Sequence, residues 1–297
     1  MSARLAWFAA LALAGCTPQV APAPITAPTG KALSTACDGR DGWSDPAPPA
    51  KIFGNTYYVG TCGISALLIA APDGLVLIDG ATAEAAPGIL ANIRALGLDP
   101  KNIRYLLASH EHLDHVGGLK ALQDATGAAV LARREAVATL TSGEPEAIDP
   151  QRGAIPPFAG VKVARELKDG EVLPIRDISL TLHATPGHTP GSTSWTWRSC
   201  EAGDCRTIAY VDSLSAVSAD DYRFSDHPDY VAMLRATFAK VPTLPCGLLI
   251  TPHPGASNLF ARLAGEAPLV DANACKTYAE GAAKRLDERL AKEAAAR

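Results

Sequence analysis

SHEHLDHVGG, residues 109–118, holds three histidines, two acidic residues and two glycines directly after an apolar run that is typical of a strand. In an extended segment, residues two apart point the same way, so His110 and His112 can bind one cation together. Asp114 and His115 lie where the chain turns into a helix and can face a second cation. Three imidazoles and a carboxylate are ligands that suit zinc. A polar surface loop with chance histidines is the alternative, and the preceding strand argues against it.

Two further histidines follow apolar strands, His188 in TPGHTPGS and His253 in LLITPHPGAS. A single histidine in a Pro-Gly loop is more often structural, but together with the first motif these two complete two sets of three ligands. His183, in the middle of a strand, and His227, in SDHPDY, are interpreted as non-ligands.

Composition and charge limit the class of protein to which this chain can belong. The 297 residues are 47% hydrophobic, which is enough for a large core in one big domain or two small ones. The formal net charge is -4, and no run of Lys or Arg occurs anywhere in the chain. The chain therefore lacks the clustered basic residues of a nucleic-acid-binding protein, and we expect no nucleic-acid partner.

The first sixteen residues, MSARLAWFAALALAGC, are typical of a signal peptide. A positive Arg4 precedes an apolar stretch, Leu5 to Leu13, that is too short to span a bilayer. Leu13 to Cys16 resembles the lipobox of bacterial lipoproteins, which implies cleavage before Cys16 and a lipid on its sulfur. An ordinary secretory signal cleaved nearby is the alternative, and either one predicts an exported protein.

The next segment predicts a flexible tether and a cellular location. Residues 17–36 begin with TPQVAPAPITAPTG, which has no hydrophobic periodicity and predicts a flexible, extended tether. The folded catalytic domain is expected over 37–297. Thr17 is not an aspartate, so by resemblance to Gram-negative lipoproteins we expect a periplasmic protein anchored by its lipid to the outer membrane. That anchor is the only membrane contact expected.

Cysteine usage fits an exported protein, because disulfides persist outside the cytosol. Without the lipidated cysteine an even number remains: Cys37, Cys62, Cys200, Cys205, Cys246 and Cys275. None belongs to a C-x-x-C pair of the kind that binds structural zinc. Spacing favours a small Cys200–Cys205 loop, but six cysteines allow about 15 connectivities.

Strands and helices alternate in two similar halves. Strands are expected over 56–60, 64–72, 75–80, 103–109 and 129–133 in the first half, and over 161–166, 178–187, 192–199, 207–213 and 247–252 in the second. Helices are expected over 84–96, 119–126, 230–240 and 277–292. This alternation predicts an α/β protein with two sheets packed face to face and helices outside. The polar strand ends then meet along one edge.

SHEHLDHVGG, TPGHTPGS, YVDSLSA and TPHPGASN resemble motifs of the metallo-β-lactamase superfamily, and specifically of the third subclass of class B β-lactamases. The resemblance covers about Cys37 to Arg297 and implies a four-layer αββα sandwich that holds two Zn²⁺ ions. The ligands that it implies are His110, His112 and His188 on the first zinc, and Asp114, His115 and His253 on the second.

The resemblance also implies roles for serines and cysteines. Ser213 occupies the position of a cysteine ligand elsewhere in the family. The implied partner of the substrate carboxylate is Ser215, and that of the zinc-bound water is Ser213. The implied disulfides are Cys37–Cys62, Cys200–Cys205 and Cys246–Cys275.

The implied activity is zinc-dependent hydrolysis of the amide bond of β-lactam antibiotics, which confers antibiotic resistance. A metal-bound hydroxide attacks the lactam carbonyl, and Asp114 orients this nucleophile. The chain has no S-x-x-K string, which argues against a serine β-lactamase. We expect a monomer. Substrate preference depends on loops near Tyr57 and over 142–158, whose shapes the sequence does not predict.

Two alternatives stay open. Hydroxyacylglutathione hydrolases and lactonases of the same superfamily share the first two motifs and carry a bridging aspartate, with which Asp212 in VDSLS could align. A non-catalytic zinc-binding lipoprotein is the other alternative. A protein that only binds zinc does not need the open coordination position that a catalytic zinc keeps for its substrate.

Overall fold

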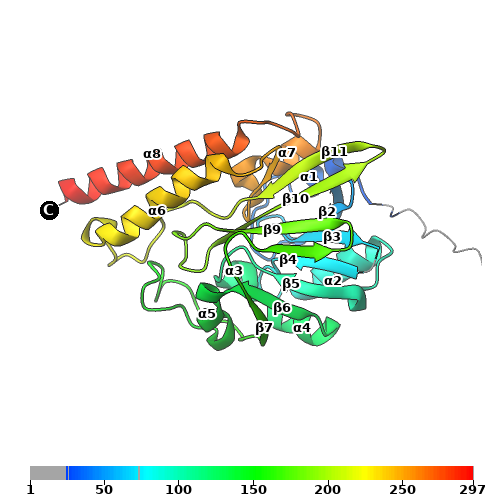
Figure 1. Cartoon of the computed structure of the whole chain (residues 1–297), viewed down its shortest axis with the longest axis horizontal. Coiled ribbons are helices and arrows are strands. Elements are labelled where there is room, and N and C mark those ends of the chain that lie inside the picture. Colours follow the sequence, from blue (N-terminus) through cyan, green and yellow to red (C-terminus); the bar gives the residue numbers. More distant parts are fainter. Residues whose placement is uncertain (1–24, 26, 73, 297) are drawn as a thin grey trace, which may run out of the picture.

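The computed structural model describes residues 25, 27–72 and 74–296, and it consists of two sheets packed face to face with helices on both outer faces (Figure 1). The expected signal peptide with Cys16, and the tether up to residue 24, lie outside the described residues.

The first sheet has seven strands in the order β1-β2-β3-β4-β5-β6-β7. Their bounds are β1 Ala50–Phe53, β2 Thr56–Tyr58, β3 Leu67–Ala71, β4 Gly74–Ile78, β5 Ile103–Leu107, β6 Ala129–Arg133 and β7 Val163–Leu167. Strands β1 to β4 pair antiparallel, whereas β4 to β7 pair parallel. The parallel strands all end at one edge, so the loops that follow them meet there.

The second sheet has five strands in the order β12-β11-β10-β9-β8. Their bounds are β8 Val172–Ile175, β9 Ile178–Ala184, β10 Thr193–Glu201, β11 Asp204–Tyr210 and β12 Leu248–Ile250. Strand β12 runs parallel to β11, and the other pairs are antiparallel.

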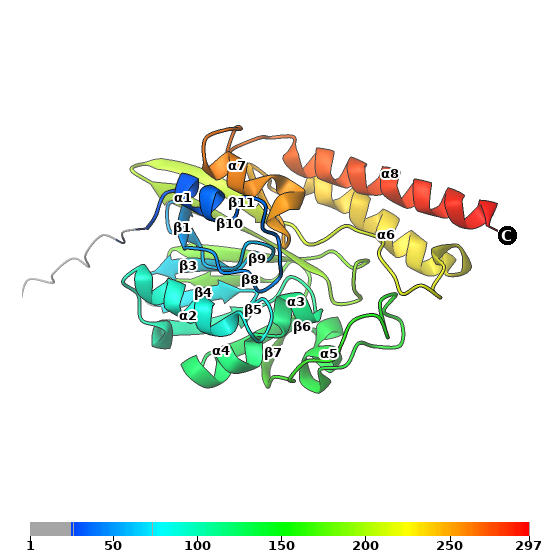
Figure 2. The ribbon, with the colours of Figure 1, turned by 180° about the vertical axis from the view of Figure 1, so that it is seen from behind.

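Helices cover both sheets. Their bounds are α1 Gly30–Ala36, α2 Ala86–Ala95, α3 Leu113–Val116, α4 Leu119–Thr126, α5 Val137–Ser142, α6 Pro228–Lys240, α7 Leu259–Leu263 and α8 Ala274–Ala295. Short 3-10 turns are η1 Pro100–Asn102, η2 Arg134–Ala136, η3 Phe224–Asp226, η4 Val241–Thr243 and η5 Pro254–Ser257. Seen from behind, α1 lies beside α7, with which it is in contact (Figure 2).

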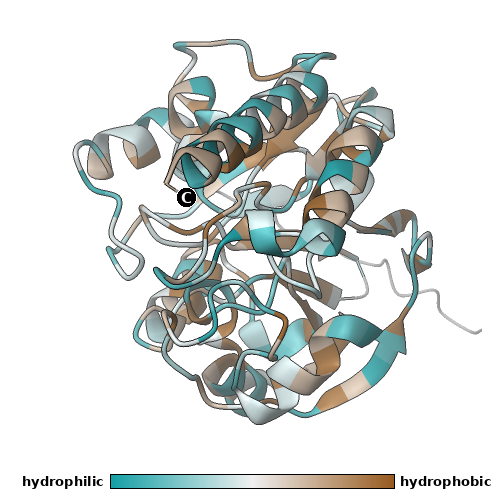
Figure 3. Ribbon diagram, turned by 90° about the vertical axis from the view of Figure 1, so that its left-hand side faces the viewer, coloured by the Kyte–Doolittle hydropathy of each residue, from teal (hydrophilic) through white to brown (hydrophobic). Residues whose placement is uncertain are grey.

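Three clusters of buried apolar residues separate the four layers. The first fills the space between the sheets and includes Trp195 from β10 and Leu67 and Ile69 from β3. The second packs α2 and α4 onto the first sheet, and the third packs α6 and α8 onto the second. Hydrophilic residues lie along the outward side of the long C-terminal helix (Figure 3). The expected αββα sandwich is confirmed.

Two expectations of the sequence analysis are wrong in detail. The strand expected over 161–166 is placed in the second half by the sequence analysis, but the observed β7 pairs with β6 in the first sheet, because a strand's own pattern does not specify its partner. Residues 30–36 were expected to be tether, yet they form α1, whose Leu33 is fully buried. The folded domain therefore begins before Cys37. Strands β1 and β8 were not expected at all.

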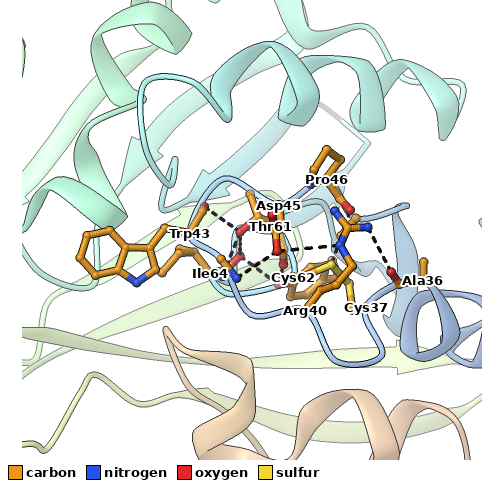
Figure 4. The surroundings of a disulfide bond; sticks show 12 residues. Ala36, Cys37, Arg40, Trp43, Asp45, Pro46, Thr61, Cys62 and Ile64 are labelled. Atoms are coloured by element: carbon orange, nitrogen blue, oxygen red, sulfur yellow. Dashed lines mark hydrogen bonds and ion pairs between the residues drawn. A yellow bond between two sulfur atoms is a disulfide. The ribbon is translucent and has the colours of Figure 1, made fainter.

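The three disulfides have the connectivity that the family resemblance implies, Cys37–Cys62, Cys200–Cys205 and Cys246–Cys275. The first bridge joins the end of α1 to the loop between β2 and β3 (Figure 4). Beside it, the hydroxyl of Thr61 donates a hydrogen bond to the carbonyl of Trp43, which holds the N-terminal loop against the sheet. Within the described residues, no helix has both the length and the apolar character needed to cross a bilayer.

Candidate metal centre

All six predicted ligands lie at the edge where strands of both sheets end. Four of them come from the segment after β5 and from α3, the fifth follows β9 and the sixth follows β12. Strands β9 and β12 of the second sheet, which are separated by β10 and β11, and strand β5 of the first sheet therefore supply a single site from positions as far apart in sequence as His110 and His253.

The first set consists of His110, His112 and His188, which offer one ligand atom each, with all three atoms within 4.8 Å of one another. The ring centroids of His110 and His188 are 4.6 Å apart. All three residues are buried. This arrangement could hold one small cation between three imidazoles.

Each ring of this set turns its other nitrogen toward an outer partner. The Nδ1 of His110 lies 2.8 Å from the Asp212 carboxylate, and the Nε2 of His112 lies 3.0 Å from that of Asp149. The Nδ1 of His188 donates to the carbonyl oxygen of Ser215 at 2.9 Å. Such outer hydrogen bonds fix the tautomer and the orientation of a metal-binding ring.

The inward nitrogen of His110 has no protein partner. Its Nε2 is buried and makes no hydrogen bond within the described residues. A buried polar atom without a partner is costly, and a bound cation supplies the missing contact. The donor set therefore fits a metal ion.

The second set consists of Asp114, His115 and His253. The Nε2 of His115 lies 3.0 Å from Asp114 Oδ2 and 3.3 Å from His253 Nε2. The Nε2 of His253 in turn lies 3.4 Å from Asp114 Oδ2. His110 also reaches Asp114 and His115 within 4.8 Å, so the two sets are immediate neighbours. The side chain of His253 is 40% exposed and marks the open side of the site.

Burial and charge set the protonation of these groups. Burial lowers the pKa of His110 well below its ordinary value, and burial together with the charge of His112 lowers the pKa of His188 to about 3. Burial also acts to lower the pKa of His115, but its acidic neighbours, chiefly Asp114, outweigh that effect and raise it to about 10. His110 and His188 thus offer neutral imidazoles, the form that binds metal ions. The second set contains a buried ion pair.

Asp79 was missed by the sequence analysis although it follows the apolar strand β4. Its carboxylate accepts hydrogen bonds from Ser109 N at 2.6 Å and from Tyr210 Oη at 2.6 Å. It also lies 3.5 Å from Nδ1 of His115. Because Tyr210 belongs to β11, one carboxylate ties the two sheets together directly beneath the site. An acidic residue at the end of an apolar strand was the available signal.

The structural role of Glu111, which lies between two of the predicted ligands, was also missed by the sequence analysis. Its carboxylate accepts hydrogen bonds from Thr189 Oγ1 at 2.8 Å and from the backbone N–H of Gly191 at 2.7 Å. Burial raises its pKa to about 6 against these hydrogen bonds. Glu111 therefore binds the first histidine loop to the loop that carries His188.

The remaining predicted residues have distinct places. Ser213 is buried next to Asp212, and the hydroxyl of Ser215 lies 3.1 Å from Nδ1 of His188. His183 contacts the hydroxyl of Thr196 at 2.8 Å, and the ring of His227 stacks on Tyr222 with centroids 4.3 Å apart. Neither of these two histidines belongs to the metal-binding groups found among the described residues.

Asp212 lies on the outer side of His110, at the ring nitrogen that faces away from the shared space. It does not belong to either group of converging ligand atoms. The alignment of Asp212 with the bridging aspartate of lactonases and thioesterases therefore finds no support in this geometry.

Comparison with known proteins agrees with the fold and the site. The family model of the Metallo-beta-lactamase superfamily matches residues 59–201. The crystal structure of the metallo-β-lactamase MIM-1 from Novosphingobium pentaromativorans is 54% identical and superposes with a TM-score of 0.87, over 89% of this chain and 98% of that one. MEM-A1, a subclass B3 metallo-β-lactamase from a soil metagenome library, is 43% identical with a TM-score of 0.83, over 86% and 100%.

Among curated proteins, the N-acyl homoserine lactonase AttM of Azorhizobium caulinodans is 28% identical over 161 residues, which are 53% of this chain and 58% of that protein. The chain spans less than two thirds of the length of the curated relatives that it matches. The solved structures match over nearly their whole length and at higher identity. The chain therefore belongs to the metallo-β-lactamase superfamily, and within it to the subclass B3 metallo-β-lactamases.

Proposed function

We propose that this protein hydrolyses the amide bond of β-lactam antibiotics with two zinc ions. The observation that carries the proposal is the pair of adjacent ligand sets, in which ring nitrogens and one carboxylate converge while outer partners hold the rings in place. His110, His112 and His188 would hold the first ion, and Asp114, His115 and His253 the second.

Bound zinc supplies two kinds of chemistry here, because it polarises a carbonyl oxygen and lowers the pKa of a water molecule toward about 7. The chain's own residues hold the reacting groups. The Asp114 carboxylate, kept ionised by His115, can accept a hydrogen bond from a water that lies between the two sets. The hydroxyls of Ser213 and Ser215, on the segment after β11, are the proposed contacts for the substrate carboxylate.

The open side of the site lies at His253, so a substrate enters there. The other five ligands are buried and stay away from bulk water. Dry surroundings strengthen the electrostatic interactions of the buried carboxylates and imidazoles. No side chain needs to form a covalent intermediate. The alternative of a protein that only binds zinc predicts a site without room for a reacting carbonyl.

The decisive test is a hydrolysis assay of the purified domain against penicillins, cephalosporins and carbapenems, with and without a chelator, combined with elemental analysis. We expect two zinc ions per chain and activity that the chelator abolishes and added zinc restores. Lactone and thioester substrates serve as the comparison. A zinc-loaded protein that hydrolyses none of the three bond types would be a metal-binding protein instead.

We propose further that the mature protein is a monomer in the periplasm, anchored to the outer membrane by a lipid on Cys16, and that it confers antibiotic resistance there. The lipobox-like segment, the Pro-rich residues after it and the six paired cysteines support an exported protein. Fractionation of cells that produce the wild type and Cys16→Ala tests the anchor. Soluble wild-type protein would contradict it, and growth of the same cells on β-lactams tests the resistance.

A further inference from the structure

A cavity lies beside the metal centre and is lined by none of its six predicted ligands. It has a volume of about 920 Å³ and opens between η5, the loop that leads into α8, and α8 itself. Apolar side chains form much of its wall, among them Leu249, Pro268 and Val270. Its size and apolar lining are those of a pocket for a small organic molecule.

Gly281 opens this cavity from the helix side. It lies in the interior of α8, where glycine is about 1 kcal/mol less favourable than alanine. Its φ is not positive, and a Cβ built on it would meet only the flexible end of Arg285, at 3.3 Å. Neither backbone conformation nor close packing requires this glycine, so its effect on the structure is the space that it leaves.

The cavity has an unpaired cation at its edge. Arg262 is fully engaged, since its guanidinium donates to the carbonyls of Leu249 and Ser257 among others. Arg285, one turn after Gly281, makes no hydrogen bond or ion pair with any described residue. Asp271 is the single acidic residue of the lining, and its carboxylate already accepts a backbone hydrogen bond. The lining therefore favours a ligand with one negative charge.

Two walls of the cavity are hydrogen-bonded to segments that carry residues of the metal centre. The ring of Tyr278 lines the cavity, and its hydroxyl lies 3.4 Å from the carbonyl of Asp212 and 3.3 Å from the N–H of Leu214. On the other side, Ser257 Oγ lies 2.9 Å from Thr251 Oγ1, which donates to the carbonyl of His253 at 2.7 Å. A ligand that moves either wall thus acts on segments that carry metal-site residues.

We propose that this cavity is a second binding site, for a small organic anion with an apolar ring, and that its occupancy is coupled to the zinc site through Tyr278. The ring packs over Gly281 against the apolar wall, and the carboxylate or sulfonate pairs with Arg285. The coupling is reciprocal, because a ligand that changes affinity at one site must be affected equally by a ligand at the other.

The probe for the test is 8-anilinonaphthalene-1-sulfonate, an aromatic monoanion whose fluorescence rises in apolar surroundings. It is titrated into the zinc-loaded enzyme with the metal centre blocked by mercaptoacetate, whose thiolate binds zinc. Gly281→Phe fills the cavity, Gly281→Ala is the matched control that changes the helix but not the space, and Arg285→Ala removes the charge. Both glycine variants are expected to melt at or above the wild-type temperature, which shows that they fold.

We expect one saturable site in the wild type and in Gly281→Ala, at least tenfold weaker binding in Arg285→Ala, and none in Gly281→Phe. The probe should also change the affinity for mercaptoacetate at least threefold, and Tyr278→Phe should abolish that change while the probe still binds. Equal binding to the wild type and Gly281→Phe would overturn the proposed site, as would fluorescence that mercaptoacetate removes completely. Binding that leaves mercaptoacetate affinity unchanged would overturn the coupling. None of these readouts depends on β-lactam hydrolysis.

Discussion

Replacing Asp212 tests whether an outer carboxylate controls the first zinc site. Its Oδ1 lies 2.8 Å from Nδ1 of His110, and both side chains are fully buried. Asp212→Ala removes this contact and leaves a buried ring N–H without an acceptor. Asp212→Asn keeps an acceptor oxygen of the same shape but removes the negative charge, which burial disfavours by raising the pKa of Asp212 and which a zinc ion on the other side of the His110 ring favours.

The magnitude follows from the type of hydrogen bond. A hydrogen bond to a charged group contributes about 1.5–3 kcal/mol, whereas a neutral one contributes about 0.5–1.5 kcal/mol. Asp212→Ala should therefore weaken binding of the first zinc about 10- to 100-fold, the range typical of outer partners of metal-binding histidines. Asp212→Asn loses only the difference, roughly 1 kcal/mol or about fivefold.

The assay is a competitive zinc titration against a chromophoric chelator, with the two binding steps fitted separately. Asp169→Asn is the matched control, because this carboxylate pairs with Lys240 at an exposed position. Unchanged zinc affinity in Asp212→Ala would refute the argument that the outer hydrogen bond supports the ligand. Loss of a complete zinc equivalent in Asp212→Asn would instead make Asp212 a ligand itself, as in the lactonase alignment.

The remaining predictions concern the ligand set, the loop contact and the disulfides. His188→Ala leaves the first ion two protein ligands, so elemental analysis should find about one zinc and activity should fall at least 100-fold; two retained ions would contradict the assignment. Glu111→Gln keeps an acceptor oxygen for the N–H of Gly191 but replaces the acceptor of the Thr189 hydroxyl by an amide N–H, which should lower the free energy of unfolding by about 0.5–1.5 kcal/mol in urea titrations. Replacing Cys246 and Cys275 by serine should lower it by about 2–4 kcal/mol while both zinc ions stay bound, and zinc loss before unfolding would show that this bridge supports the metal site.

Local patterns in the sequence were sufficient to identify the chemistry. The two-residue spacing of His110 and His112 after an apolar strand encodes a shared direction, because alternate side chains of an extended segment lie on the same side. His188 and His253 could be recognised for a similar reason, since each follows its own apolar strand. The alternation of strands and helices in turn predicted the layers of the sandwich.

Interactions between distant segments were decided by the tertiary structure alone. Asp79, Asp149 and Asp212 hold the ligand rings from positions that are distant in sequence, and nothing near them marks them as partners of particular histidines. The pairing of β7 with β6, against the expected division into halves, depends on which strand edge is free when the chain returns. Leu33 likewise becomes a core residue only because α1 packs on the folded domain. A residue's own neighbours fix its backbone preference and the side it faces, whereas its long-range partners exist only once the two sheets have packed.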